Sequence, residues 1–138
     1  MHFDIDERLR ERGRGIMQGL TTAEMLDQCP DVYEFFRNNG PDYLIPEGES
    51  FRQFNDRCVN AIEDFSVRHS GKSILVVTHG GVLGAIFRHA IGLSLDSPRR
   101  CALLNCSVNV IEKKDGDWSL LHWGDVSHLP EGELLDDA

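Results

Sequence analysis

Residues 74–84 have the sequence ILVVTHGGVLG, and this stretch decides the fold that the sequence predicts. The four aliphatic residues 74–77 are typical of a strand buried on both faces of a parallel sheet. The glycines and small apolar residues that follow predict a closely packed helix ending near Gly92. His79 therefore stands where a strand ends and a helix begins, which is where ligands bind in open α/β sheets.

The predicted surroundings of His79 suit an anion. Gly80 and Gly81 let the backbone approach a ligand closely, and a helix start directs unpaired N–H groups and the positive end of its dipole to the same point. The alternative is that His79 only ends the strand and bonds to a loop carbonyl. A dinucleotide site is disfavoured, because HGGVLG lacks the G-x-G-x-x-G pattern and no acidic residue ends a following strand.

The remaining elements follow from local patterns. TTAE (21–24) predicts a capping box, and Pro30 suits the first turn of the next helix, PDVYEFFRN. The strongest helix starts at Ser50, and KDGD (114–117) predicts a turn joining strands 103–113 and 118–124. Helices that precede and separate strands indicate the α/β class. The apolar face of the Ser50 helix consists of Phe51, Phe54, Cys58, Ile62 and Phe65.

Length and composition restrict the class of protein. The 138 residues predict one domain, and the net charge of −9 argues against nucleic acid as the main partner. No apolar run approaches the roughly 20 residues of a membrane helix, so no membrane partner is expected. The charged N-terminus lacks an apolar signal core, so we expect a cytoplasmic protein. No cysteine pair or His cluster has metal-ligand spacing, so no metal is expected.

A second unusual stretch is DERLRERGRGIMQGLTTAE, residues 6–24. Glu11 lies there among four arginines, and a carboxyl group among guanidiniums is expected to be ionised and paired. Gly13, Gly15 and Gly19 disfavour a helix and indicate a loop that must fit a fixed shape. The alternative interpretation is a solvated charged segment.

Five segments in this order and spacing resemble the histidine phosphatase superfamily, the phosphoglycerate mutase-like proteins. The resemblance implies an α/β fold with a mostly parallel sheet flanked by helices, here missing its first central strand. The segments are LRERGRGIMQG (9–19), PEGESF (46–51) with Arg57 downstream, VVTHGGVLGAIFRHAIG (76–92), LLNCSVNVI (103–111) and HWGDVSHL (122–129).

The resemblance also implies a chemistry, phosphoryl transfer through a phosphohistidine, with no metal or organic cofactor. It makes Glu11 the general acid and base, and His79 the second histidine of the phosphate pocket. Both roles are physically sound, because a carboxyl group can protonate a leaving oxygen and an imidazolium at a helix start stabilises transferring oxygens. It further implies that Arg12, Gly80 and Asn105 contact a small phosphorylated substrate or phosphate.

The family's nucleophile lies in an R-H-G motif after the first strand, and we find no such motif. His2 in MHFDI has no Arg before it and no Gly after it. Arg68–His69 precedes a strand instead of following one, and Arg88–His89 falls inside a helix. We therefore expect residues 1–138 to form a single, N-terminally truncated domain without its nucleophile. Its exposed sheet edge is expected to promote a homodimer.

Three functions remain open. Phosphomonoester hydrolysis is favoured over mutase-type phosphoryl transfer, because the chain after Leu9 has no long insertion that could enclose a bisphosphate. If the nucleophile is absent, the chain is expected to be inactive by itself. The third alternative is a non-catalytic domain that only binds phosphate or serves an interaction.

Overall fold

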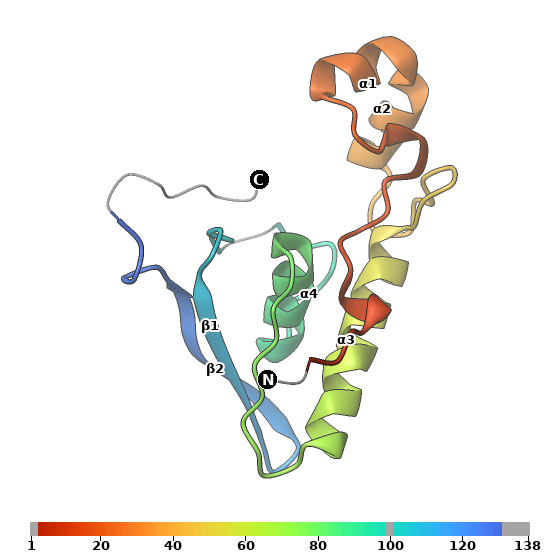
Figure 1. The fold of residues 1–138 in the computed structure, drawn as a ribbon. Coiled ribbons are helices and arrows are strands. Elements are labelled where there is room, and N and C mark those ends of the chain that lie inside the picture. Colours follow the sequence, from red (N-terminus) through yellow and green to blue (C-terminus); the bar gives the residue numbers. More distant parts are fainter. Residues whose placement is uncertain (1–2, 99–100, 131–138) are drawn as a thin grey trace.

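The computed structural model describes residues 3–98 and 101–130. In Figure 1, α4 lies between α3 and a β-hairpin, while α1 and α2 form a separate group at one end of α3. Two short 3₁₀ turns, η1 and η2, precede the helices. The elements are η1 (Glu7–Leu9), η2 (Gly15–Met17), α1 (Thr22–Gln28), α2 (Pro30–Asn38), α3 (Phe51–Arg68), α4 (Gly80–Ala90), β1 (Val108–Lys114) and β2 (Asp117–Asp125).

The helix starts follow the predicted caps. Thr21 forms a capping box with Glu24, and Ser50 forms the same arrangement with Gln53 at the start of α3. Pro30 occupies the first turn of α2, where its missing N–H costs no hydrogen bond. No helix in the described ranges is both long enough and apolar enough to cross a bilayer.

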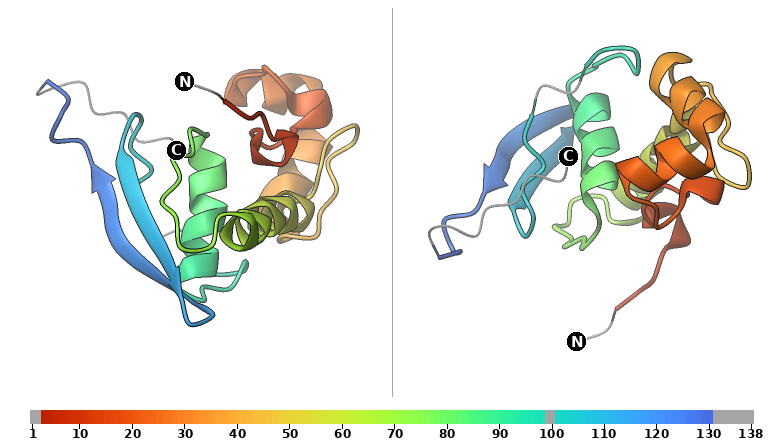
Figure 2. Two further views of the ribbon diagram at one scale, coloured as in Figure 1. Left: turned by 60° about the horizontal axis from the view of Figure 1, so that its bottom comes forward. Right: turned by 90° about the horizontal axis from the view of Figure 1, so that it is seen from above.

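The hydrophobic core is divided into two clusters. The larger one joins the predicted apolar face of α3 to α4, and Ile111 and Trp118 of the hairpin pack against it. The smaller one, Met17, Met25 and Ile45, holds α1 and α2 against the loop before α3. Figure 2 shows, from two further directions, the ribbons of α3, α4 and the hairpin and those of α1 and α2. The buried members of the larger cluster are Phe54, Cys58, Ile62, Val82, Ala85 and Ile86.

The prediction of a mostly parallel sheet is not confirmed. The described residues form only one sheet, the antiparallel pair β1–β2. Residues 74–77 lead from α3 to α4 without belonging to a strand, and Leu75 and Val77 are 86% and 89% exposed. A strand needs backbone hydrogen bonds from a neighbour, and no described segment supplies them here. The α/β class itself is retained.

The predicted hairpin turn is confirmed, but the first strand begins later than predicted. Asp115 and Gly116 have φ values of 54° and 95°, as a tight hairpin turn requires. β1 begins at Val108 instead of Leu103. Cys106 has a φ of 59°, and a turn closed by the Ser107 N–H on the Leu104 carbonyl occupies the segment before the strand.

Glu63 of α3 ties the hairpin to both long helices. Its carboxylate accepts a hydrogen bond from Lys113 of β1 and another from the Trp118 indole of β2, at 2.7 Å. The same carboxylate lies 2.8 Å from His89 Nε2 of α4. The hydrogen bonds from Lys113 and then Trp118 lower the pKa of Glu63 to about 2. The ionised carboxylate therefore links α3 to three other elements, β1, β2 and α4.

This cluster predicts a defined pH dependence of stability. Because the folded pKa of Glu63 lies below its unfolded value of about 4.3, its contribution is present above that value and is lost as pH falls toward about 2. We expect Glu63→Gln to lower the free energy of unfolding at pH 6 and to reduce its slope between pH 5 and 2. Urea unfolding at several pH values measures both. Glu112→Gln, an exposed change on β1, is the control and should leave the slope unchanged.

The exposed segment 74–77 predicts self-association, in line with the expected homodimer. Leu75→Lys and Val77→Lys should each lower the weight-average sedimentation coefficient at a given concentration, because charge on a strand edge opposes pairing between chains. Val67→Lys is the matched control, since Val67 is 75% exposed on the surface of α3. A wild-type chain that sediments as a monomer at all concentrations would contradict the prediction.

Candidate functional site

The loop from Glu7 to Met17 has the fixed shape that its glycines predict. Gly15 has a φ of 50°, and a Cβ atom there would lie 1.9 Å from the Pro46 carbonyl oxygen. The Ile16 N–H donates to that same carbonyl at 3.1 Å. The loop is therefore seated against residues 46–48, the segment just before α3, and is not a solvated charged segment.

An ion pair between Glu49 and Arg57 organises this loop. Arg57 donates from Nε to Glu49 Oε2 at 2.9 Å and from Nη2 to Glu49 Oε1 at 2.6 Å, so the pair is bidentate. The two side chains are only 14% and 15% exposed. Arg57 also donates to the carbonyls of Arg8, Arg10 and Glu11, at 2.6, 2.8 and 3.1 Å. The pair thus binds the loop backbone directly.

The pKa values of this pair follow from their contact. Burial by itself would raise the pKa of Glu49, but hydrogen bonds from Arg57 and from the Gly13 N–H outweigh burial and lower it. Burial by itself would lower the pKa of Arg57, but the hydrogen bond to Glu49 outweighs it and raises that pKa. Both groups stay charged over the ordinary pH range.

Glu11 lies at the start of α4. Its Oε2 accepts the Gly81 N–H at 3.0 Å, and its Oε1 accepts the N–H of Arg12 at 2.7 Å. A Cβ atom at position 81 would lie 2.2 Å from Glu11 Oε1, so glycine is needed for this approach. The carboxylate therefore occupies the position where the positive end of the helix dipole is strongest.

His79 is the residue that precedes α4, and its side chain is exposed. Its imidazole makes no hydrogen bond within the described residues, so a structural bond to a loop carbonyl is not found. Thr78 beside it donates to the Leu9 carbonyl at 2.9 Å, which fastens the start of α4 to the loop that carries Glu11. The structure thus brings together the two segments that were predicted to share a site.

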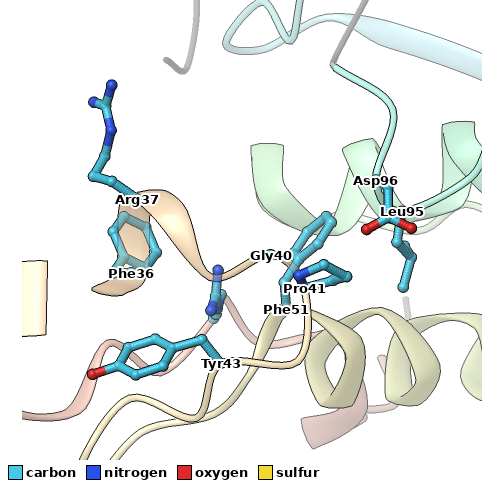
Figure 3. A pocket seen from close by; sticks show the side chains of 9 residues that line it. Phe36, Arg37, Gly40, Pro41, Tyr43, Phe51, Leu95 and Asp96 are labelled. Atoms are coloured by element: carbon cyan, nitrogen blue, oxygen red, sulfur yellow. The ribbon is translucent and has the colours of Figure 1, made fainter. Parts of the chain in front are cut away.

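Arg12 lies on the wall of a cavity of about 280 Å³. Its guanidinium lies 5.4 and 5.6 Å from the ring centroids of Phe36 and Phe51, and it donates to the Glu49 carbonyl at 3.2 Å. Burial lowers the pKa of Arg12. Figure 3 shows Arg37 pointing away from the other labelled side chains of this cavity. Arg12, next to Glu11 in the chain, is therefore a half-buried cation on the wall of this cavity, whose lining includes neither Glu11 nor His79.

The remaining predicted binding residues, Gly80 and Asn105, make no hydrogen bond to Glu11 among the described residues. Gly80 begins α4, but Gly81 is the residue whose N–H contacts Glu11. Asn105 is exposed in the turn before β1 and has no hydrogen bond to Glu11 or to the start of α4 among the described residues. The binding roles of Arg12, Gly80 and Asn105 stay predictions.

The histidines that follow arginines lie elsewhere. His69 ends α3, and His89 lies in the last turn of α4 against Glu63. His2 is outside the described residues. In the part of the chain that the structure describes, no three His, Cys, Asp or Glu side chains gather as metal ligands.

The sequence analysis gave Glu49 no role, and it named Arg57 only as part of the family resemblance, without a contact. Both belong to the PEGESF segment and the helix after it, so the resemblance had marked the region without giving a contact. Eight positions separate them, and one precedes the helix while the other is inside it. No short-range helix rule predicts such a pair.

Comparisons with known proteins agree with this geometry. Residues 1–126 match the model of the histidine phosphatase superfamily (branch 1), and the chain belongs to this family. It is 43% identical over 133 residues to phosphoglycerate mutase-like protein 4 of Arabidopsis thaliana, covering 94% of this chain and 56% of that protein. It is 42% identical over 122 residues to the metal-independent phosphoserine phosphatase of Arabidopsis thaliana, covering 88% and 50%.

Solved structures show the same fold. Bacillus stearothermophilus YhfR superposes with a TM-score of 0.72 at 33% identity, covering 89% of this chain and 61% of that chain. The alpha-ribazole phosphatase from Shigella flexneri gives a TM-score of 0.73 at 22% identity, covering 88% and 60%, which supports the fold alone. The chain thus spans about half the length of the curated relatives it matches.

The seating of the Glu11 loop can be tested at its glycines. Gly15→Ala should cost about 2 to 4 kcal/mol of unfolding free energy, because it combines a left-handed backbone with a clash against the Pro46 carbonyl. Gly19→Ala is the matched control: its φ is 78°, but nothing lies within 4 Å, so only the backbone cost of about 1 to 2 kcal/mol remains. Urea unfolding of both variants measures the difference, and equal losses would contradict the seating.

Proposed function

We propose that this chain provides the acid–base and phosphate-binding side of a phosphomonoesterase site. The proposal depends on one observation: the Glu11 carboxylate accepts a hydrogen bond from the Gly81 N–H, two residues after His79. A carboxyl group, a histidine and a helix start at one point suit the transfer of a phosphoryl group. Hydrolysis is the reaction class proposed for the complete protein.

In the proposed reaction, a histidine nitrogen attacks phosphorus and the bond from phosphorus to the leaving oxygen breaks. Glu11 gives its proton to that oxygen, and the product alcohol departs. Glu11 then takes a proton from water, which attacks the phosphohistidine and releases phosphate. His79, as an imidazolium, stabilises the charge on the transferring oxygens. The accepting histidine is not among the side chains that the described residues bring to this point.

Two alternatives differ from hydrolysis in the fate of the phosphoryl group. In mutase-type transfer, a second hydroxyl group removes the phosphoryl group instead of water, and one similar protein is named phosphoglycerate mutase-like. In a binding protein, phosphate occupies the site without turnover. The phosphoserine phosphatase among the similar proteins favours hydrolysis as the working proposal.

The test is hydrolysis of an alkyl phosphomonoester by the complete protein, in which a segment that carries the R-H-G histidine is joined to this chain. Glu11→Gln should lower kcat by about 10² to 10⁴-fold with little change in phosphate affinity, because it removes the proton donor and keeps the shape. His79→Ala should cost about 2 to 4 kcal/mol of transition-state stabilisation. Glu112→Gln, on the exposed face of β1, and His69→Ala change the same residue types away from the site and serve as controls.

Each outcome of this assay separates the alternatives. Equal loss of turnover and phosphate affinity in Glu11→Gln would limit Glu11 to shaping the loop. Phosphate binding that depends on His79, without turnover by the wild type, would favour the binding protein. Neither binding nor turnover would contradict the proposal.

A further inference from the structure

The guanidinium of Arg57 is fully used by the loop that carries Glu11. A guanidinium has five N–H bonds, and each one of Arg57 has an acceptor in the structure. Nε and one Nη2 hydrogen bind Glu49, the other Nη2 hydrogen binds the Glu11 carbonyl, and Nη1 binds the carbonyls of Arg8 and Arg10. Such complete use of a planar fork specifies arginine and not merely a positive charge.

Glu49 fixes the loop backbone on the C-terminal side of Glu11. Its Oε1 accepts the Gly13 N–H at 2.8 Å as well as the Arg57 hydrogen bond, and its own N–H donates to the Gly13 carbonyl at 3.1 Å. The backbone is therefore fixed at Glu11 by Arg57 and two residues later by Glu49. The side chain between these points has only to reach the Gly81 N–H.

We propose that Arg57 and Glu49 are positioning residues for Glu11 and set the geometry of its proton transfer. This inference rests on the role given to Glu11 in the proposed function. Arg57 and Glu49 act on Glu11 through its backbone, by the contacts given above. A misplacement of about 1 Å at a catalytic group can cost about 10²-fold in rate, so the pair governs kcat through the loop.

A positioning role has a kinetic consequence that a general loss of stability does not have. Protonation of the leaving oxygen matters most for a poor leaving group, such as the alkoxide of an alkyl phosphomonoester. p-Nitrophenolate departs readily without a proton. A displaced Glu11 should therefore slow the alkyl substrate more than p-nitrophenyl phosphate, while substrate binding is little changed.

The kinetic experiment compares Arg57→Lys and Glu49→Gln with the wild type on both substrates, all in the complete protein that carries the R-H-G histidine. Arg57→Lys keeps the charge and loses the fork, and Glu49→Gln keeps the shape and loses the charge. We expect kcat for the alkyl substrate to fall about tenfold more than kcat for p-nitrophenyl phosphate, with KM nearly constant. The control is Arg52→Lys, on the same helix, whose pair with Asp42 is exposed. Equal falls on both substrates, or wild-type rates in Arg57→Lys, would overturn the proposal.

A second readout needs no turnover. The Gly81 amide proton is bonded to the Glu11 carboxylate, so its NMR shift should follow the ionisation of Glu11 in a pH titration. We expect Arg57→Lys and Glu49→Gln to abolish this response, as Glu11→Gln must. The Trp118 indole proton, held by Glu63, should keep its wild-type position and so report an intact fold.

The two readouts keep the proposals apart. A complete wild-type protein without turnover counts against the proposed function, and the positioning role is then judged by the Gly81 response alone. If that response survives in both variants with Trp118 unchanged, Arg57 and Glu49 do not position Glu11. If Arg57→Lys alone fails to fold, Glu49→Gln decides the question.

Discussion

The bidentate contact between Glu49 and Arg57 is the interaction on which the candidate site depends. The N-terminal loop brings four arginines into a short stretch that contains the 3₁₀ turns η1 and η2, and the residues between these turns depend on contacts with other segments for their shape. A carboxylate and a guanidinium, both largely buried, supply that shape by binding the loop backbone on either side of Glu11. Removing one partner leaves a buried charge unpaired, which makes such a pair costly to break.

The loop that carries Glu11 contributes to the candidate site through its contacts with the start of α4. Glu11 reaches the Gly81 N–H, and Thr78 fastens the residue before His79 to the Leu9 carbonyl. Three segments that are far apart in the chain thus meet: the N-terminal loop, the start of α3 and the start of α4. The packing of α3 on α4 through Phe54, Cys58 and Val82 keeps them in register. Burial raises the pKa of the Cys58 thiol to about 11, as expected for a core cysteine.

Much of the local structure could be predicted because its causes are local. The capping box at Thr21, Pro30 in the first turn of α2 and the turn at Asp115–Gly116 each depend on a few neighbouring residues. The meeting of Glu11 with the segment after His79 was expected from the family resemblance, and the structure brings them together. Segment 74–77 was predicted wrongly as a paired strand, because pairing depends on a neighbour that residues 74–77 do not themselves specify.

The sequence by itself determined the helices, the hairpin and the α/β class, since these follow from periodicity, caps and turn residues. The acid–base role of Glu11 came from the family resemblance and stays a prediction. Only the tertiary structure decided that Glu49 and Arg57 clamp the loop, that Gly81 and not Gly80 meets Glu11, and that Arg12 lines a cavity between two aromatic rings. The physical reason is that these contacts join segments separated by many residues. Their geometry is set by how α3 packs on α4, which no local pattern encodes.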